Sequence, residues 1–105
     1  MQVRKRNGAI VSYDRTFILR AVTLAAAAAG EHDSRAAEAV AHAAEKKLQL
    51  RSEEIVDIET IQDAVEEALF EQGQFKTAKA YILYRMDKAR IRADWKEGLL
   101  SREFL

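Results

Sequence analysis

One dipeptide near the start of the chain, Asn7-Gly8, most constrains what the chain can fold into. A two-residue type I′ turn needs positive φ at both central positions, and Asn-Gly is a pair that adopts it readily. The sequence therefore predicts two short antiparallel strands joined at this turn. Three consecutive cations precede the turn in the first predicted strand: Arg4, Lys5 and Arg6. Because side chains alternate along a strand, Arg4 and Arg6 are expected on one face and Lys5 on the other.

Helical patterns follow the hairpin, and glycines separate them, since the chain has four glycines and no proline. Apolar residues recur at helical spacing in four stretches, and Gly30 and Gly73 stand where two of these stretches end. On the last stretch, the residues expected to face inward are Ala78, Tyr81, Ile82 and Met86. The predicted helices run from Arg15 to Ala29, from a cap at Asp33 or Ser34 to about Leu48, from a cap at Asp57 to Gly73, and from Gln74 or Phe75 to about Ala93.

These elements predict a mostly α (α+β) fold: a four-helix bundle capped by a small two- to three-stranded antiparallel β-sheet. The third strand is expected around residues 54–56, where the helical period breaks. Residues 1–93 are expected to form one domain, because 105 residues is near the common domain size. Residues 94–105 are expected to be a linker or the start of a following domain that this sequence lacks. They include Trp95, Leu99, Leu100, Phe104 and Leu105.

Composition argues against several classes of function. Lys and Arg number 17 and Asp and Glu number 17, so the formal net charge is zero, whereas nucleic-acid binders usually show a basic excess. The absence of cysteine excludes disulfides, thiolate metal sites and thiol radical chemistry within this chain. No apolar run is long enough to span a membrane and no secretory signal is visible, so a cytoplasmic location is expected.

Catalytic and metal-binding patterns are equally scarce. The sequence shows no nucleophile–base pair and no cluster of metal ligands, and its only histidines are His32 and His42. The common glycine-rich phosphate motifs are absent as well. The acidic residues of the third helix are interpreted as a solvated face. The chain alone is therefore not expected to be an enzyme.

The basic hairpin allows two interpretations. Edge strands often carry Lys and Arg only to prevent pairing with other strands. Alternatively, a cation turned towards the helices needs an anionic partner, and the expected helix N-termini at Asp14 and Asp57 favour a bound phosphate. The basic residues near the end of the fourth helix, which include Lys88 and Arg90, are also typical of a helix C-terminus.

Four sequence segments point to a family by their order and spacing. They read V-R-K-R-N-G at 3–8, V-S-Y-D-R at 11–15, I-E-T-I-Q-D-A-V-E-E-A-L at 58–69 and A-K-A-Y-I-L-Y-R at 78–85. Together with a first helix that ends in an alanine-rich turn, they resemble the ATP-cone. This allosteric nucleotide-binding domain usually stands at the N-terminus of ribonucleotide reductases. The resemblance covers about residues 2–92.

The resemblance implies a four-helix bundle covered by a three-stranded sheet, with ATP or dATP bound between them and Mg²⁺ held on the phosphates. The two nucleotides would compete for one site and control the catalytic domain of the parent reductase through conformation or homo-oligomerisation. No protein side chain is expected to bind the metal. The implied nucleotide-binding residues are Val3, Arg4, Lys5, Arg6, Asp14, Ile18, Asp57, Gln62, Lys88 and Arg90.

One residue departs from the family pattern. Members commonly have Lys or Arg one turn into the first helix, where this chain has Phe17. We expect Phe17 to pack in the pocket wall and either Arg15 or Arg20 to supply the charge. Two alternatives to the cone are a small nucleic-acid-binding module, which would use the basic hairpin and the fourth helix, and a helical oligomerisation module without a ligand.

Overall fold

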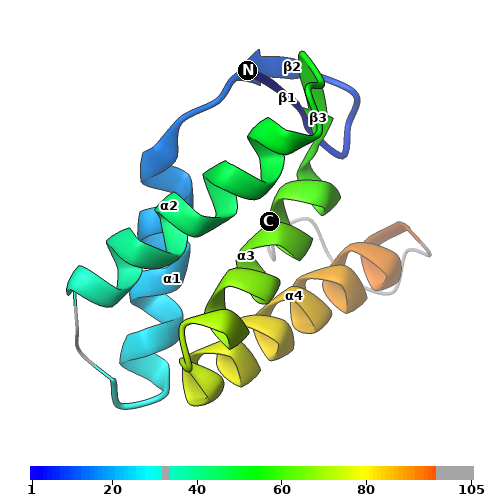
Figure 1. The fold of residues 1–105 in the computed structure, drawn as a ribbon. Coiled ribbons are helices and arrows are strands. Elements are labelled where there is room, and N and C mark those ends of the chain that lie inside the picture. Colours follow the sequence, from blue (N-terminus) through cyan, green and yellow to red (C-terminus); the bar gives the residue numbers. More distant parts are fainter. Residues whose placement is uncertain (32–33, 97–105) are drawn as a thin grey trace.

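Three short strands form a small sheet at one end of four helices (Figure 1). The computed structural model describes residues 1–31 and 34–96. The predicted mostly helical fold, with four helices and a small sheet, is confirmed. The elements are β1 (Gln2–Arg4), β2 (Ile10–Ser12), α1 (Arg15–Ala28), α2 (Ser34–Leu50), β3 (Ile55–Asp57), α3 (Ile58–Glu71) and α4 (Phe75–Lys96).

The sheet is mixed, so the prediction of a wholly antiparallel sheet is wrong. Its order is β2-β1-β3, with β1 antiparallel to β2 and parallel to β3. Val3 at the centre of β1 stands opposite Val11 on one side and Val56 on the other. Only β1 and β2 are joined by a tight turn. The chain returns to β3 through α1 and α2, and a crossover of that length permits parallel pairing.

The hairpin turn also differs from the predicted type I′ geometry. Gly8 has a φ of 88°, but the only non-glycine residue with positive φ in the described ranges is Ser52, so Asn7 is not left-handed. Lys5 N donates to Ala9 O at 2.8 Å and Gly8 N donates to Lys5 O at 2.9 Å, which closes a three-residue loop. The Asn7 side chain instead accepts a hydrogen bond from Ala9 N at 3.0 Å. Arg6 therefore lies in the loop.

Local signals set the helix ends. The Asp14 carboxylate caps α1 by accepting from Thr16 N at 2.9 Å. Gly30 and Gly73, with φ of 77° and 74°, follow α1 and α3 as the pattern predicts. The amides that come after each helix donate to its last turn, as Glu31 N does to Ala26 O at 2.8 Å. Asp57 is the N-cap residue of α3, but its side chain makes no capping hydrogen bond, contrary to prediction.

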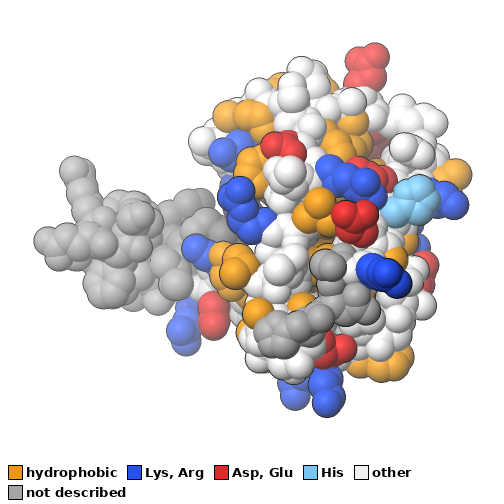
Figure 2. Space-filling model, turned by 90° about the vertical axis from the view of Figure 1, so that its left-hand side faces the viewer, with side chains coloured by type: hydrophobic (Ala, Val, Ile, Leu, Met, Phe, Trp, Pro, Cys, Tyr) orange, Lys and Arg blue, Asp and Glu red, His pale blue; other side chains and the backbone are white. Residues whose placement is uncertain are grey.

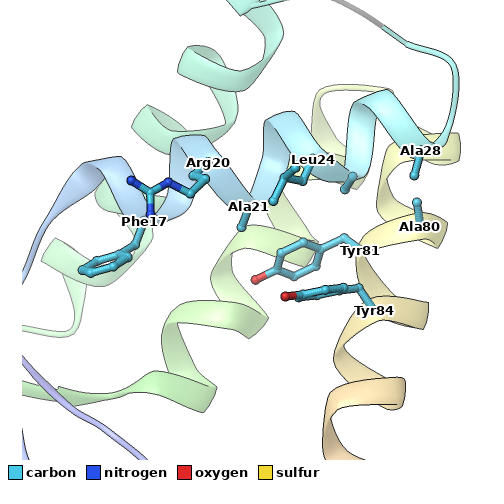
Figure 3. Close-up of a pocket in the computed structure, with 9 residues that line it drawn as sticks. Phe17, Arg20, Ala21, Leu24, Ala28, Ala80, Tyr81 and Tyr84 are labelled. Atoms are coloured by element: carbon cyan, nitrogen blue, oxygen red, sulfur yellow. The ribbon is translucent and has the colours of Figure 1, made fainter. Parts of the chain in front are cut away.

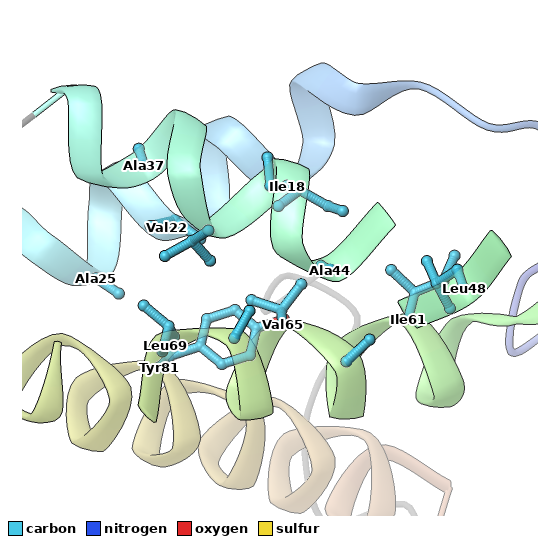
Figure 4. Close-up of a cluster of buried hydrophobic side chains, with 14 of the residues drawn as sticks. Ile18, Val22, Ala25, Ala37, Ala44, Leu48, Ile61, Val65, Leu69 and Tyr81 are labelled. Atoms are coloured by element: carbon cyan, nitrogen blue, oxygen red, sulfur yellow. The ribbon is translucent and has the colours of Figure 1, made fainter. Parts of the chain in front are cut away.

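Each helix packs against two others, because α1 and α3 both contact α2 and α4. Small side chains on α2 let its backbone approach its neighbours closely. Figure 4 shows the apolar side chains of α1, α2 and α3 meeting between the helices, with Tyr81 added from α4. The buried apolar residues are Val3, Ile18, Val22, Ala25, Ala37, Val40, Ala41, Ala44, Leu48, Val56, Ile61, Ala64, Val65, Ala68, Leu69, Ala78 and Tyr81.

The inward face of α4 was only partly predicted. Ala78 and Tyr81 are buried and Ile82 is half-buried, but Met86 is 61% exposed. Arg85 takes the inward position instead, with a side chain 17% exposed, because carboxylates of α3 stand opposite it. The helix runs to Lys96, beyond the predicted end. Most of the predicted linker, residues 97–105, lies outside the described residues, as does the candidate cap Asp33.

A carboxylate from the α1–α2 connection caps α4. Glu31 Oε1 accepts from Thr77 N at 3.2 Å and from Thr77 Oγ1 at 3.1 Å, and Thr77 is only 1% exposed. Loss of such a cap costs about 1 kcal/mol. We expect Glu31→Ala to lower the free energy of unfolding by about that amount. Urea denaturation should show no change for the exposed control Glu38→Ala, and equal stabilities of the two variants would contradict the cap.

None of the described helices has a stretch that is both long and apolar enough to cross a membrane.

Candidate functional site

A pocket of about 590 Å³ opens between the sheet and the helices. The hairpin of β1 and β2 and the helices α1, α3 and α4 contribute to its wall. This wall is largely apolar with a few polar side chains. This composition is typical of small-molecule sites. The lining residues are Val3, Lys5, Val11, Ser12, Tyr13, Asp14, Phe17, Ile18, Ala21, Ile58, Ile61, Gln62, Val65 and Tyr81.

Five of the ten sequence-predicted site residues lie together in this pocket: Val3, Lys5, Asp14, Ile18 and Gln62. They come from the first strand, the start of α1 and the first turns of α3, which the fold brings to one end of the molecule. Strand alternation explains why Val3, at the centre of β1, and Lys5, just after its end, share the helix-facing side. The Lys5 side chain makes no hydrogen bond or ion pair within the described part of the chain.

Arg4, Arg6 and Asp57 stand beside the pocket and are not part of its wall. Arg4 Nη1 pairs with Asp57 Oδ1 at 2.9 Å, because the parallel register sets these two residues opposite each other. Arg6 Nε pairs with Glu59 Oε1 at 2.9 Å. Arg6 Nη2 also donates to Gln62 Oε1 at 2.8 Å, which links Arg6 to a residue of the wall. Arg4 and Arg6 therefore each have an acidic partner in the protein, whereas Lys5, the cation that lines the pocket, has none among the described residues.

The structure does not bring Lys88 and Arg90 to the pocket. Both are exposed on the later part of α4. Lys88 Nζ lies 5.6 Å from the centre of the Tyr84 ring, a cation–π contact. Tyr84 itself lines a second hollow, a groove between α1 and α4 shown in Figure 3.

An ion-pair cluster joins α3 to α4 next to Arg6. Arg85 Nη2 pairs with Glu59 Oε2 at 2.8 Å and Arg85 Nη1 with Asp63 Oδ1 at 3.2 Å, and Glu66 contacts Arg85 closely. Burial by itself would lower the pKa of Arg85, but the three carboxylates outweigh it and raise that pKa. Burial would likewise raise the pKa of Glu59, yet Arg85 and Arg6 hold it below its usual value.

This cluster was missed because the acidic residues of α3 were interpreted as a solvated face. Glu59, Asp63 and Glu66 follow one another at i, i+4 and i+7, a spacing that puts them on one side of a helix. That spacing indicates that one cation could pair with all three carboxylates. Glu59 now connects Arg6 in the hairpin loop to Arg85 on α4.

Comparison with known proteins identifies the family. A family model described as the ATP cone domain matches residues 1–90. The chain belongs to the ATP-cone family. ATP-cones are the allosteric nucleotide-binding regulatory domains of ribonucleotide reductases, and the predicted recognition is confirmed.

Curated relatives carry this domain within much longer chains. The cone is 38% identical over 101 residues to the anaerobic ribonucleoside-triphosphate reductase of Salmonella typhimurium, covering 96% of this chain and 14% of that protein. It is 37% identical over 91 residues to the vitamin B12-dependent ribonucleoside-diphosphate reductase of Mycobacterium tuberculosis, covering 87% and 13%. Ribonucleoside-diphosphate reductase subunit alpha of Chlamydia pneumoniae is 48% identical over 50 residues, covering 48% and 5%. The cone thus spans a small part of each relative.

Several further residues of the pocket wall were assigned no role in the site by sequence reasoning. Val11, Ser12 and Tyr13 follow one another along β2 and its exit. The Tyr13 hydroxyl donates to Glu45 Oε2 at 2.7 Å, and burial, with help from Glu45, raises the pKa of Tyr13, so it remains a phenol. Burial raises the pKa of Tyr81 to about 12. Both tyrosines are therefore neutral wall residues at neutral pH.

Phe17 lies in the pocket wall of the cone, as predicted, although it is 62% exposed. The two cations considered as substitutes at this position have different surroundings. Arg15 Nε lies 3.3 Å from Glu45 Oε1, so Arg15 is held towards α2. Arg20 instead lines the groove between α1 and α4 together with Phe17.

Proposed function

We propose that the pocket between the sheet, α1 and α3 is the effector site of this cone and that it binds either ATP or dATP. The observation that carries the proposal is the convergence of Val3, Lys5, Asp14, Ile18 and Gln62 on one pocket. Lys5 supplies an unpaired cation for the phosphates, while Val3 and Ile18 supply an apolar surface. These residues come from three separate parts of the fold, the first strand and its exit, the start of α1, and α3, which supports a built site.

The polar residues of the pocket suit different parts of a nucleotide. Lys5 is a donor and a point charge, so it matches a phosphate. Asp14 uses Oδ1 to cap α1, and Thr16 holds its pKa below the usual range by donating to it. The ionised carboxylate is an acceptor and suits a ribose hydroxyl. ATP and dATP differ only in the 2′-hydroxyl, so a sensor of their ratio must respond to that group.

The metal is proposed to arrive with the nucleotide. Among the described residues, no group of three or more His, Asp or Glu side chains is placed to hold a metal ion. Mg²⁺ usually keeps several waters and binds substrate phosphates with few protein ligands. Bound there, Mg²⁺ would neutralise part of the charge of the phosphates.

The regulatory role requires that ATP and dATP favour different states. A ligand with equal affinity for two states shifts neither of them. We propose that the occupied cone differs in conformation or in self-association according to the nucleotide, and so controls the catalytic domain of a ribonucleotide reductase. The Arg6–Glu59–Arg85 series offers a physical link from the pocket edge to α4. The catalytic chemistry belongs to another part of that reductase.

The two alternatives have different signatures. A nucleic-acid module would bind DNA or RNA with a steep salt dependence, and an oligomerisation module would respond to neither ligand. Figure 2 shows Lys and Arg side chains interspersed with Asp and Glu on the one face that it draws. Mixed charge of this kind favours the nucleotide site.

Thermal denaturation with and without Mg-ATP tests the proposal. A ligand at about a hundred times its Kd stabilises a folded protein by about 2.7 kcal/mol, so the melting temperature should rise with ATP concentration. The same series with a DNA duplex should leave it unchanged at physiological salt. A rise with DNA and none with ATP or dATP would contradict the effector site and favour the nucleic-acid module.

A further inference from the structure

The cations around the pocket differ in whether a carboxylate already holds them. Arg4, Arg6, Arg15 and Arg85 each pair with at least one acidic side chain. An incoming anion must compete with those carboxylates. The Arg20 side chain has no hydrogen bond or ion pair within residues 1–31 and 34–96, and it is exposed. Its guanidinium is therefore available to an anion without the loss of an existing pair.

Arg20 stands where two hollows adjoin. The groove between α1 and α4 has a volume of about 210 Å³, and Arg20 is part of its lining. Phe17, Ala21 and Tyr81 line both this groove and the larger pocket, so one wall separates them. Figure 3 shows the Arg20 side chain extending along α1 towards Phe17 and away from Leu24. The guanidinium is thus directed at the pocket end of the groove.

Electrostatics agree with this direction. Hydrogen bonds from Thr16 are the main cause of the lowered pKa of Asp14, and the positive charge of Arg20 lowers it further. Asp14 is a wall residue of the pocket. The positive charge of Arg20 therefore acts on a residue of the pocket wall.

We propose that Arg20 is an anion-binding residue of this pocket, which reaches past Phe17 to the phosphate chain of the nucleotide while Lys5 binds it from β1. The proposal rests on the effector site proposed above. A guanidinium presents a planar fork of donors that matches two phosphate oxygens at once. Arg15, although nearer the start of α1, is less suited to this role, because an anion would have to compete with Glu45 for it.

Calorimetric titration of the full chain with Mg-ATP tests the assignment. Arg20→Gln should weaken binding about three- to tenfold, the effect of one exposed hydrogen-bonding contact, and Arg20→Lys should recover part of the loss. The matched control is Arg51→Gln, which removes an arginine that pairs with Glu53 outside the pocket wall. It should leave the affinity unchanged. Equal affinities of the wild type and Arg20→Gln, or an equal loss in Arg51→Gln, would overturn the proposal.

A double-mutant cycle separates direct contact from an effect through Asp14. If Arg20 contacts phosphate, Arg20→Gln should weaken Mg-ATP binding by a similar factor in the wild type and in an Asp14→Asn background. Loss of the effect in that background would overturn the proposal, because Arg20 would then act only on Asp14. Failure of the wild type to bind either ATP or dATP would instead overturn the effector site itself.

Discussion

Replacement of both Lys5 and Arg6 by Ala is expected to weaken Mg-ATP binding at least about tenfold, because a charge-assisted contact contributes on the order of 1.5–3 kcal/mol. Lys5 lines the pocket without a partner, and Arg6 donates to Gln62 in the pocket wall. Arg6 must shift from Glu59 and Gln62 to meet a phosphate, so its share should be the smaller one. Calorimetric titration measures the affinity.

The matched control for this pair is Lys46→Ala with Arg51→Ala. It removes two cations that do not line the pocket, so it reproduces the change in net charge. Its affinity for Mg-ATP should equal that of the wild type, and both variants should keep the helical circular dichroism spectrum. Unchanged affinity in the Lys5→Ala, Arg6→Ala variant would show that β1 does not hold the phosphates.

Arg85→Met is expected to produce the largest loss of stability among the polar substitutions. The Arg85 side chain is 17% exposed and Glu66 is 24% exposed, whereas Glu59 and Asp63 are 55% and 68% exposed. Breaking a fully buried pair costs about 3–5 kcal/mol, so this partly solvated cluster should lose about 2 kcal/mol. Urea denaturation should show this loss, whereas Arg90→Met, exposed on the same helix, should show none.

The pH dependence of this loss has a defined sign. Arg85 and Arg6 lower the pKa of Glu59 in the folded cone, so the stability from this contact is present above the unfolded pKa of Glu. It is lost as the pH falls through the lowered folded pKa. The difference in stability between the wild type and Arg85→Met should therefore shrink below about pH 4. A difference that stays constant from pH 7 to pH 3 would assign the loss to packing alone.

The elements that the sequence predicted best are those that depend on local chemistry. The helix ends at Gly30 and Gly73 follow from the left-handed conformation that glycine adopts easily. The hairpin was located correctly, but its turn type was not, because the Asn7 side chain bonds to Ala9 N and Asn7 does not take positive φ. The parallel pairing of β3 depends on the path of α1 and α2, which no local pattern encodes.

The candidate site was predicted by resemblance more than by pattern. The resemblance assigned ten residues to one site, and five of them share one pocket: Val3, Lys5, Asp14, Ile18 and Gln62. Composition and spacing alone indicated only a basic hairpin near helix starts. The Arg85 cluster could not be assigned, because a helical face can be read from spacing but the partner across the helix interface cannot. For the same reason, the choice between Arg15 and Arg20 needed the positions of Glu45 and the groove.

A titration of the ¹⁵N-labelled chain with Mg-ATP, followed by displacement with Mg-dATP, tests the effector site most directly. The amide resonances of Lys5, Asp14, Ile18 and Gln62 should shift together and saturate at one ATP concentration. Addition of dATP should move the same set to new positions, because one pocket takes both nucleotides. Absence of saturable shifts with either nucleotide, or shifts confined to the opposite end of the helices around Gly30 and Gly73, would contradict the effector site between the sheet, α1 and α3.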